Sequence, residues 1–215
     1  MESSTRTRVS FGSAFNLLGG HVRETSDVSS SAFVKGESVR DAARILSGYS
    51  DVICIRHPKS GSVKEFADFS RVPVINGGDG SNEHPTQALL DLFTIKKELE
   101  NKNRDLSKLR IAIVGDLLFG RTVHSLSYAL VRFGCKLTLV SPESLKLPEE
   151  IINELKEQGG ELKITEELKP QLENADVVYM TRIQKERFPD EDEYVRIAGV
   201  YKLVADDLSS VKKDM

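Results

Sequence analysis

The chain has few cysteines, a nearly balanced charge and no long hydrophobic run. Its 215 residues include two cysteines, and 30 Lys and Arg residues face 33 Asp and Glu residues, for a formal net charge of -3. This balance argues against nucleic acid or an anionic membrane as a partner, so any anion site must be local. No apolar segment is long enough to span a bilayer and no charged-then-apolar leader follows Met1. We therefore expect a cytoplasmic protein with no membrane partner.

The two cysteines do not form a recognisable pair. Cys54 lies in the apolar run 52–55, and Cys135 follows a predicted helix. Neither has a CxxC partner, which disfavours a zinc site and a disulfide scaffold. The sequence therefore predicts two buried core thiols and no metal site.

What the chain does have is an alternation of short apolar runs and amphipathic segments. Helical periodicity predicts helices at 8–18, 39–46, 63–69, 85–99, 121–133 and 148–158. Short apolar runs predict strands at 52–55, 72–76, 109–114, 137–140, 162–164 and 177–180. A polar, charged stretch at 100–107 looks like a boundary between two such series. We predict an α/β fold of two doubly wound domains, each with a mostly parallel sheet flanked by helices, at 1–103 and 104–215.

The stretch 3–11 combines hydroxyls, cations and a predicted helix start. Ser4 or Thr5 can cap the helix, which leaves free backbone N–H groups and the positive end of the helix dipole facing outward. Arg6 adds a planar charged fork that suits phosphate oxygens, and Thr7 adds a further hydroxyl. The stretch is therefore a candidate phosphate site, and an ordinary capped, basic helix start is the alternative.

Further polar residues lie at predicted strand ends or helix starts. Arg56 follows the strand 52–55, while His84 and Gln87 lie where the loop after the next strand enters a helix. Arg121 begins a predicted helix, and Arg182 follows the last strand. Each residue alone is more often structural, but several at the carboxyl ends of parallel strands indicate a ligand site.

The segment 115–122 reads GDLLFGRT and nearly matches the phosphate loop GxxxxGK[ST]. Arginine replaces the lysine, and the two residues are not equivalent in that cradle. We therefore disfavour nucleotide binding.

These segments together resemble a known family. They read STRTR at 4–8, KGE at 35–37, RHP at 56–58, DGSNEHPTQ at 79–87, GRTVHSL at 120–126 and TRIQKER at 181–187. Their order and content resemble the aspartate carbamoyltransferase catalytic chain, within the aspartate/ornithine carbamoyltransferase superfamily. The first and fourth are similar to those of carbamoyltransferases generally, and the last two to those of the aspartate-using branch.

The resemblance implies transfer of a carbamoyl group from carbamoyl phosphate to L-aspartate, in de novo pyrimidine biosynthesis, without a cofactor. The implied catalytic residues are Thr5, Arg6, Arg56 and His84. Carbamoyl phosphate would be bound by Ser4, Thr5, Arg6, Thr7, Arg56, His84 and Gln87. Aspartate would be bound by Lys35, Arg121, Arg182 and Gln184.

Ser31 and Lys35 match residues that, in the family, enter the site of a neighbouring subunit, so the resemblance implies a homotrimer. Whether regulatory chains also bind is left open. Family chains begin earlier and continue past Met215, so we expect a chain that lacks segments at both ends. Two alternatives stay open: a non-catalytic fragment that acts as an interaction module, and a carbamoyltransferase for another amine such as ornithine.

Overall fold

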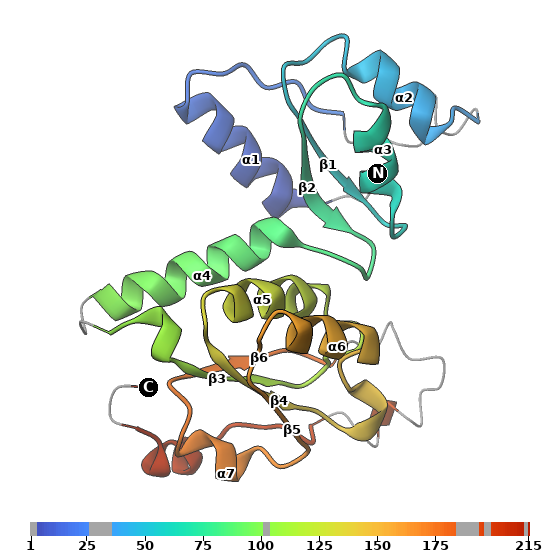
Figure 1. Cartoon of the computed structure of the whole chain (residues 1–215). Coiled ribbons are helices and arrows are strands. Elements are labelled where there is room, and N and C mark those ends of the chain that lie inside the picture. Colours follow the sequence, from blue (N-terminus) through green and yellow to red (C-terminus); the bar gives the residue numbers. More distant parts are fainter. Residues whose placement is uncertain (1–3, 26–35, 101–103, 184–193, 196–198, 213–214) are drawn as a thin grey trace. The chain divides into compact units, whose positions relative to one another are not determined.

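The computed structural model describes residues 4–25, 36–100, 104–183, 194–195, 199–212 and 215. By packing, the chain divides into two compact units, Met1–Thr86 and Gln87–Met215 (Figure 1). The division falls inside one helix, whereas the sequence suggested a boundary after residue 103. Each unit is described by itself.

The first unit combines a two-stranded parallel sheet with helices. Its elements are α1 (Thr5–Leu17), α2 (Val39–Leu46), β1 (Ile53–His57), α3 (Ser62–Phe69) and β2 (Val74–Asp79). Strand β1 pairs with β2, and the pairing is irregular between Ile55 and His57. The core includes Ile55, Val63 and Phe66, none more than 4% exposed. Burial of these side chains holds α2 and α3 against the sheet.

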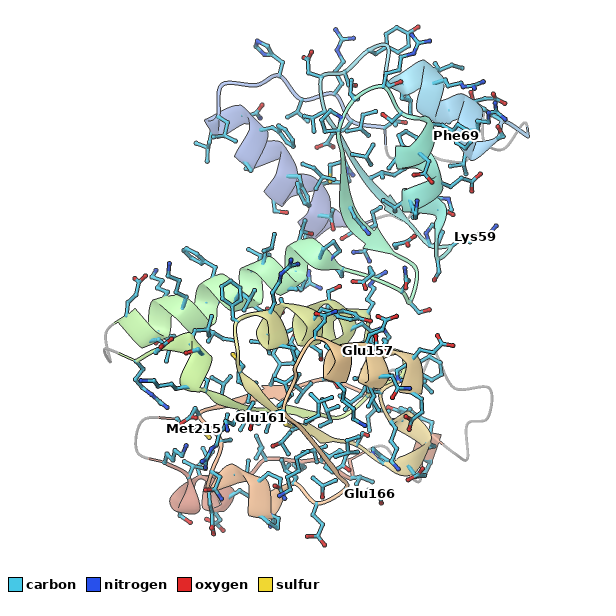
Figure 2. The ribbon with its side chains drawn as sticks, in the orientation of Figure 1. Lys59, Phe69, Glu157, Glu161, Glu166 and Met215 are labelled. Atoms are coloured by element: carbon cyan, nitrogen blue, oxygen red, sulfur yellow. The ribbon has the colours of Figure 1, made fainter. Side chains whose placement is uncertain are left out.

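Three local details of the first unit bear on the sequence predictions. Ser38 caps α2, because its Oγ accepts the Asp41 amide at 3.1 Å, which agrees with a helix predicted from residue 39. Apolar residues recur at helical spacing in α1 but are not packed: no residue of this helix is buried, and Val9 is 61% exposed. Figure 2 shows Phe69 at the end of α3, and the Arg40 guanidinium of α2 lies 4.7 Å from its ring centroid. This cation–π contact helps to fix α2 on α3.

The second unit is built on a four-stranded parallel sheet. Its helices and strands are α4 (Pro85–Glu100, whose first two residues belong to the first unit), β3 (Arg110–Val114), α5 (Arg121–Arg132), β4 (Lys136–Val140), α6 (Glu149–Glu157), β5 (Leu162–Thr165), α7 (Lys169–Leu172) and β6 (Val177–Met180). Short 3-10 turns occur at η2 (Leu106–Lys108), η3 (Glu143–Leu145) and η5 (Ala205–Ser210). The strand order is β5-β4-β3-β6.

Alternate side chains of β3 enter two different cores. Ile111 and Ile113 pack with residues of α4, α5 and α6, whereas Ala112 and Val114 pack with α7 and the residues after β6. This follows from the period of two along a strand. Figure 1 shows α5 and α6 on one face of the sheet and α7 on the other. The predicted fold class, an α/β fold with parallel sheets flanked by helices, is confirmed.

A buried carboxylate holds together three separate segments of the second unit. Asp176 is 5% exposed and accepts hydrogen bonds from Arg104 Nη2 at 2.5 Å, Lys212 Nζ at 2.6 Å and the Arg110 amide at 2.8 Å. Burial alone would raise the pKa of Asp176, but these hydrogen bonds lower it below its usual value. The ionised carboxylate is therefore the native form.

The two thiols differ in burial. Cys135 is buried and its Sγ donates to the Leu106 carbonyl at 3.2 Å, whereas Cys54 in β1 is only half-buried, which corrects the prediction for that residue. Both are free, and burial raises the pKa of each to about 11. Within the residues described, no helix is long and apolar enough to cross a membrane.

Candidate functional site

The start of α1 forms a compact array of hydroxyls. Ser4 is the N-cap, with extended backbone, and its Oγ accepts the Thr7 amide at 3.4 Å and the Thr7 hydroxyl at 3.0 Å. With both bonds accepted, the Ser4 hydroxyl proton can be donated outward. Thr5 and Arg6 are exposed on the first turn. Hydroxyl donors, a guanidinium and a helix N-terminus therefore lie together, which is the chemistry that a phosphate requires.

A glycine on β2 lets α1 approach the sheet. A Cβ at Gly77 would lie 3.3 Å from Thr7 Cγ2 and 3.3 Å from Cys54 Sγ. These distances are tighter than ordinary contacts, so a larger residue would push the helix start away from the strands. Gly77 thus lets Thr7, at the start of α1, lie against β2 and close to Cys54 of β1.

Arg56 lies within β1, not after it. The strand extends to His57 because its pairing with β2 continues to His57 opposite Asp79. The Arg56 side chain runs over the neighbouring strand: a Cβ at Gly78 would lie 3.4 Å from its Cγ and from its Nη1. Arg56 is half-buried and its Nε is fully buried. The strand and the glycine therefore fix the direction of this guanidinium.

Asp79 ties the loop that leads to His84 onto the loop after β1. Its carboxylate is 2% exposed and accepts the Gly61 amide at 2.9 Å and the Val63 amide at 3.4 Å, at the start of α3. The N-cap residue of α3 is Gly61, which has no side chain to cap the helix, so Asp79 supplies the cap from a distant part of the chain. His84 is half-buried with a buried Nδ1, and it follows this anchored loop.

The two loops also touch through backbone. Gly80 has φ +56°, and a Cβ there would lie 2.6 Å from the Ser60 amide nitrogen, so only glycine fits. Its N–H donates to the His57 carbonyl at 2.8 Å. His57 Nδ1 accepts the Lys59 amide at 3.1 Å, and burial lowers the pKa of this histidine. Figure 2 shows Lys59 itself pointing away from the unit.

In the second unit the strand order creates a switch point between β3 and β6. Strand β4 lies on one side of β3 and β6 on the other. Ligands of open α/β sheets bind outside the carboxyl ends of two such strands. Arg182 follows β6 and Arg121 begins the helix after β3, so both arginines lie at this edge.

Thr181, which follows β6, is hydrogen-bonded to the end of β3 and to the loop after it. Its Oγ1 accepts the Asp116 amide at 2.7 Å and donates to the Val114 carbonyl at 3.1 Å. Gly115 has φ +115°, and a Cβ there would lie 2.5 Å from Thr181 Oγ1. The segments that carry Arg121 and Arg182 are thus joined directly, with Arg121 half-buried and Arg182 exposed. Two guanidinium forks at one edge suit a ligand with two carboxylates.

The loop 115–122 has the strand–loop–helix form of a phosphate loop but a different interior. Asp116 is 1% exposed, and its Oδ1 accepts the Phe119 amide at 2.8 Å. A phosphate loop presents its amides to the ligand, whereas here a carboxylate occupies the inside of the turn. His124 Nε2 lies 3.0 Å from the Leu117 carbonyl and further fixes the loop. The absence of nucleotide binding stays a prediction.

Gln87 lies on the first turn of α4, three residues after His84. Its Nε2 donates to Asp91 Oδ1 at 3.0 Å, and Asp91 Oδ2 accepts the Tyr179 hydroxyl at 2.9 Å. Three predicted site residues, Ser31, Lys35 and Gln184, lie outside the described residues. Within the described part of the chain, no group of three or more His, Cys, Asp or Glu side chains could hold a metal ion.

Sequence reasoning missed several residues that shape the site. Asp79, Asp91, Thr181 and Tyr179 carry the anchoring contacts described above, but none of them was a candidate. Asp79 and Thr181 stood inside quoted motifs, and their position at strand ends could have marked them. The hydrogen bond between Asp91 and Tyr179 joins residues 88 positions apart, so no local sequence pattern could predict it.

Fold and site together define a two-unit α/β protein with candidate anion-binding groups at the carboxyl ends of its parallel strands. Residues 1–97 match the aspartate/ornithine carbamoyltransferase carbamoyl-P binding domain, and residues 107–215 match the Asp/Orn binding domain of the same family. The chain therefore belongs to the aspartate/ornithine carbamoyltransferase family.

Individual relatives carry the name aspartate carbamoyltransferase catalytic subunit. That of Cellvibrio japonicus is 58% identical over 203 residues, which cover 94% of this chain and 60% of the relative. That of Methanothrix thermoacetophila is 49% identical, with 100% of this chain and 69% of the relative covered. The chain thus spans about three fifths to two thirds of the length of such relatives.

Solved structures agree with this assignment. Aspartate transcarbamoylase from Trypanosoma cruzi in complex with carbamoyl phosphate is 37% identical, with a TM-score of 0.89 over 100% of this chain and 68% of that one. The catalytic subunit of M. jannaschii aspartate transcarbamoylase is 49% identical, with a TM-score of 0.80 over 94% of this chain and 65% of that one.

Proposed function

We propose that the protein transfers the carbamoyl group of carbamoyl phosphate to L-aspartate, giving N-carbamoyl-L-aspartate and phosphate, in de novo pyrimidine biosynthesis. The observation that carries the proposal is the hydroxyl array at the start of α1, where Ser4 caps the helix and Thr7 lies against Gly77 of β2. A dianionic phosphate suits this position because backbone N–H groups, hydroxyls and a guanidinium all donate there. The names of the relatives support carbamoyl phosphate and aspartate as the substrates.

In the first step the phosphate end of carbamoyl phosphate is held by Ser4, Arg6 and Thr7. The attack of an amine on the carbamoyl carbon creates a tetrahedral intermediate with an oxyanion, which donors must stabilise. Thr5, Arg56 and His84 are assigned to this task. The fixed direction of Arg56 over Gly78 and the anchored loop before His84 support the assignment. Phosphate then leaves while its charge stays compensated by the same donors, so no metal or cofactor is needed.

The acceptor is assigned to the second unit. Arg121 and Arg182 lie at the switch point between β3 and β6 and would each pair with one carboxylate of aspartate, with Gln184 beside them. Ornithine has only one carboxylate, so the two arginines favour aspartate. Ser31 and Lys35 are assigned to a neighbouring subunit of a cytoplasmic homotrimer, Lys35 as an aspartate ligand there.

The test is formation of carbamoyl aspartate by the purified chain, with ornithine as a parallel acceptor and Arg182→Ala as the matched variant. We expect product when aspartate is the acceptor and none when ornithine is. In the variant, the KM for aspartate should rise about 10- to 100-fold because a charge-assisted hydrogen bond is lost. Binding of carbamoyl phosphate, measured by calorimetry, should stay unchanged in Arg182→Ala.

The alternatives give different results. Carbamoyl phosphate binding without transfer to either amine would identify a binding module rather than an enzyme. Product with ornithine but not aspartate would refute the assignment of the acceptor. Absence of both binding and transfer would refute the proposed function.

A further inference from the structure

Asp91 accepts hydrogen bonds from two different elements of the second unit. Its Oδ1 takes the Gln87 amide nitrogen one turn earlier on α4, at 3.0 Å, and its Oδ2 takes the Tyr179 hydroxyl of β6, at 2.9 Å. The phenol is hydrogen-bonded in turn by the side chain of Thr122 in α5. All four residues are half-buried. A single carboxylate therefore connects α4 with β6, the strand that precedes Arg182, and through Tyr179 with α5, the helix that begins at Arg121.

The chemistry of this carboxylate fixes the orientation of the Gln87 amide. An ionised carboxylate only accepts, so the amide of Gln87 must turn its nitrogen toward Asp91 and leave its oxygen facing the other way. Tyr179 must be the donor in its own contact, since burial and the charge of Asp91 raise its pKa to about 12. Both carboxylate oxygens are thereby engaged, which restricts rotation of the Asp91 side chain.

We propose that Asp91 is a positioning residue that presents the Gln87 side-chain oxygen to the NH2 of the carbamoyl group, and that Tyr179 holds Asp91 in place. This inference rests on the proposed function. An NH2 group is a donor and needs an acceptor opposite it. Asp91 selects the one amide orientation that offers an oxygen, and it does so without touching the substrate.

The test compares two ligands, carbamoyl phosphate and inorganic phosphate, by calorimetry on the full chain. Inorganic phosphate has no NH2, so its affinity should not depend on Gln87. Asp91→Asn is nearly isosteric but has one acceptor and one donor, so it cannot accept from both Gln87 and Tyr179. If the bond from Tyr179 persists, the new amide faces Gln87 and turns the Gln87 NH2 toward the ligand. We expect the affinity for carbamoyl phosphate to fall about tenfold while that for phosphate stays the same.

A double-mutant cycle separates positioning from general damage. Gln87→Ala should lower the affinity for carbamoyl phosphate by a similar factor, and Asp91→Asn added to it should cause no further loss beyond about twofold. Tyr179→Phe should give a smaller loss, because Asp91 can still accept from Gln87. Asp68→Asn is the matched control, since Asp68 is an exposed helix carboxylate paired with Lys64. It should leave both affinities unchanged.

The outcomes distinguish the two levels of the proposal. The positioning role would be overturned if Asp91→Asn lowered the affinity for both ligands equally, or lowered neither. It would also be overturned if the losses of affinity in the cycle were additive. The proposed function would stand in each case. A native chain that binds phosphate but not carbamoyl phosphate would overturn the proposed function, and this inference with it.

Discussion

Replacing Asp79 by alanine should remove the hydrogen bonds between helix α3 and the loop that leads to His84, and so lower the stability of α3. The carboxylate accepts the amides of Gly61 and Val63, and α3 has no side-chain cap of its own. Val63 is buried, so its N–H would be left without an acceptor, at a cost of about 1–3 kcal/mol. Gly61 is exposed, and water can replace the lost acceptor there. Loss of a negative charge at the helix N-terminus adds about 0.3–1 kcal/mol.

These two contributions add to about 1–4 kcal/mol, and relief of the desolvation cost of the buried carboxylate offsets part of the larger values, so we expect a net loss of about 2–3 kcal/mol. The assay is urea unfolding of the full chain together with amide hydrogen exchange. Protection of the amides in Ser62–Phe69 should fall by about 30- to 100-fold, while those in Arg121–Arg132 should not change. Asp79→Asn retains one acceptor oxygen and should lose about half as much stability.

Asp68→Ala on the same helix is the control. Asp68 is 56% exposed at its side chain and pairs with Lys64 at 2.9 Å, one turn away, so its removal should cost less than about 0.5 kcal/mol. If Asp79→Ala costs no more than Asp68→Ala, or if exchange accelerates equally in both units, the long-range cap is not what holds α3.

Three further predictions concern packing, charge and thiol reactivity. Gly115→Ala should lower stability by about 3 kcal/mol or more, because its Cβ would lie 2.5 Å from Thr181 Oγ1 at a positive φ; an unchanged melting temperature would contradict this. Asp176→Asn should destabilise the chain by about 3 kcal/mol at neutral pH, because the half-buried Arg104 and Lys212 lose the counter-charge of the buried carboxylate. Burial alone would raise the pKa of Asp176, but its basic partners lower it, so this contribution is full above 3.8 and fades as the pH falls through the native pKa. Chemical unfolding of the native chain and of Asp176→Asn at several pH values tests this. A difference in free energy of unfolding that grows in acid would refute it. With pKa values of about 11 against an ordinary 9.0, Cys54 and Cys135 should alkylate about 100-fold more slowly at pH 8 in the native chain than in urea, as mass spectrometry can measure; equal rates would show that the thiols are accessible.

The site could be anticipated only in part. Their places at predicted strand ends and helix starts, and then the resemblance, identified Arg56, His84 and Gln87 as candidates, and the structure places each at the end of β1 or at the start of α4. It could not identify Asp79 or Asp91, which hold the neighbouring elements in place. Residues that touch a ligand lie in recognisable motifs, whereas those that support them are defined by contacts across the fold.

The sequence by itself determined the local features of this protein. Ser4 and Ser38 cap their helices because a cap depends on a hydroxyl and an amide three residues later. The parallel strands follow from short apolar runs between helical segments, which need no distant information. The alternation of strands and helices then implied the fold class.

Only the tertiary structure decided where the strands end and how the candidate site is supported. The extension of β1 to His57 depends on its pairing with β2, and the hydrogen bond of Thr181 to the loop after β3 depends on the pairing of β3 with β6. The Asp91–Tyr179 hydrogen bond joins residues 88 positions apart. Such contacts depend on the packing of whole elements, because hydrogen-bond partners that are distant in sequence meet only after the sheet and its helices have formed.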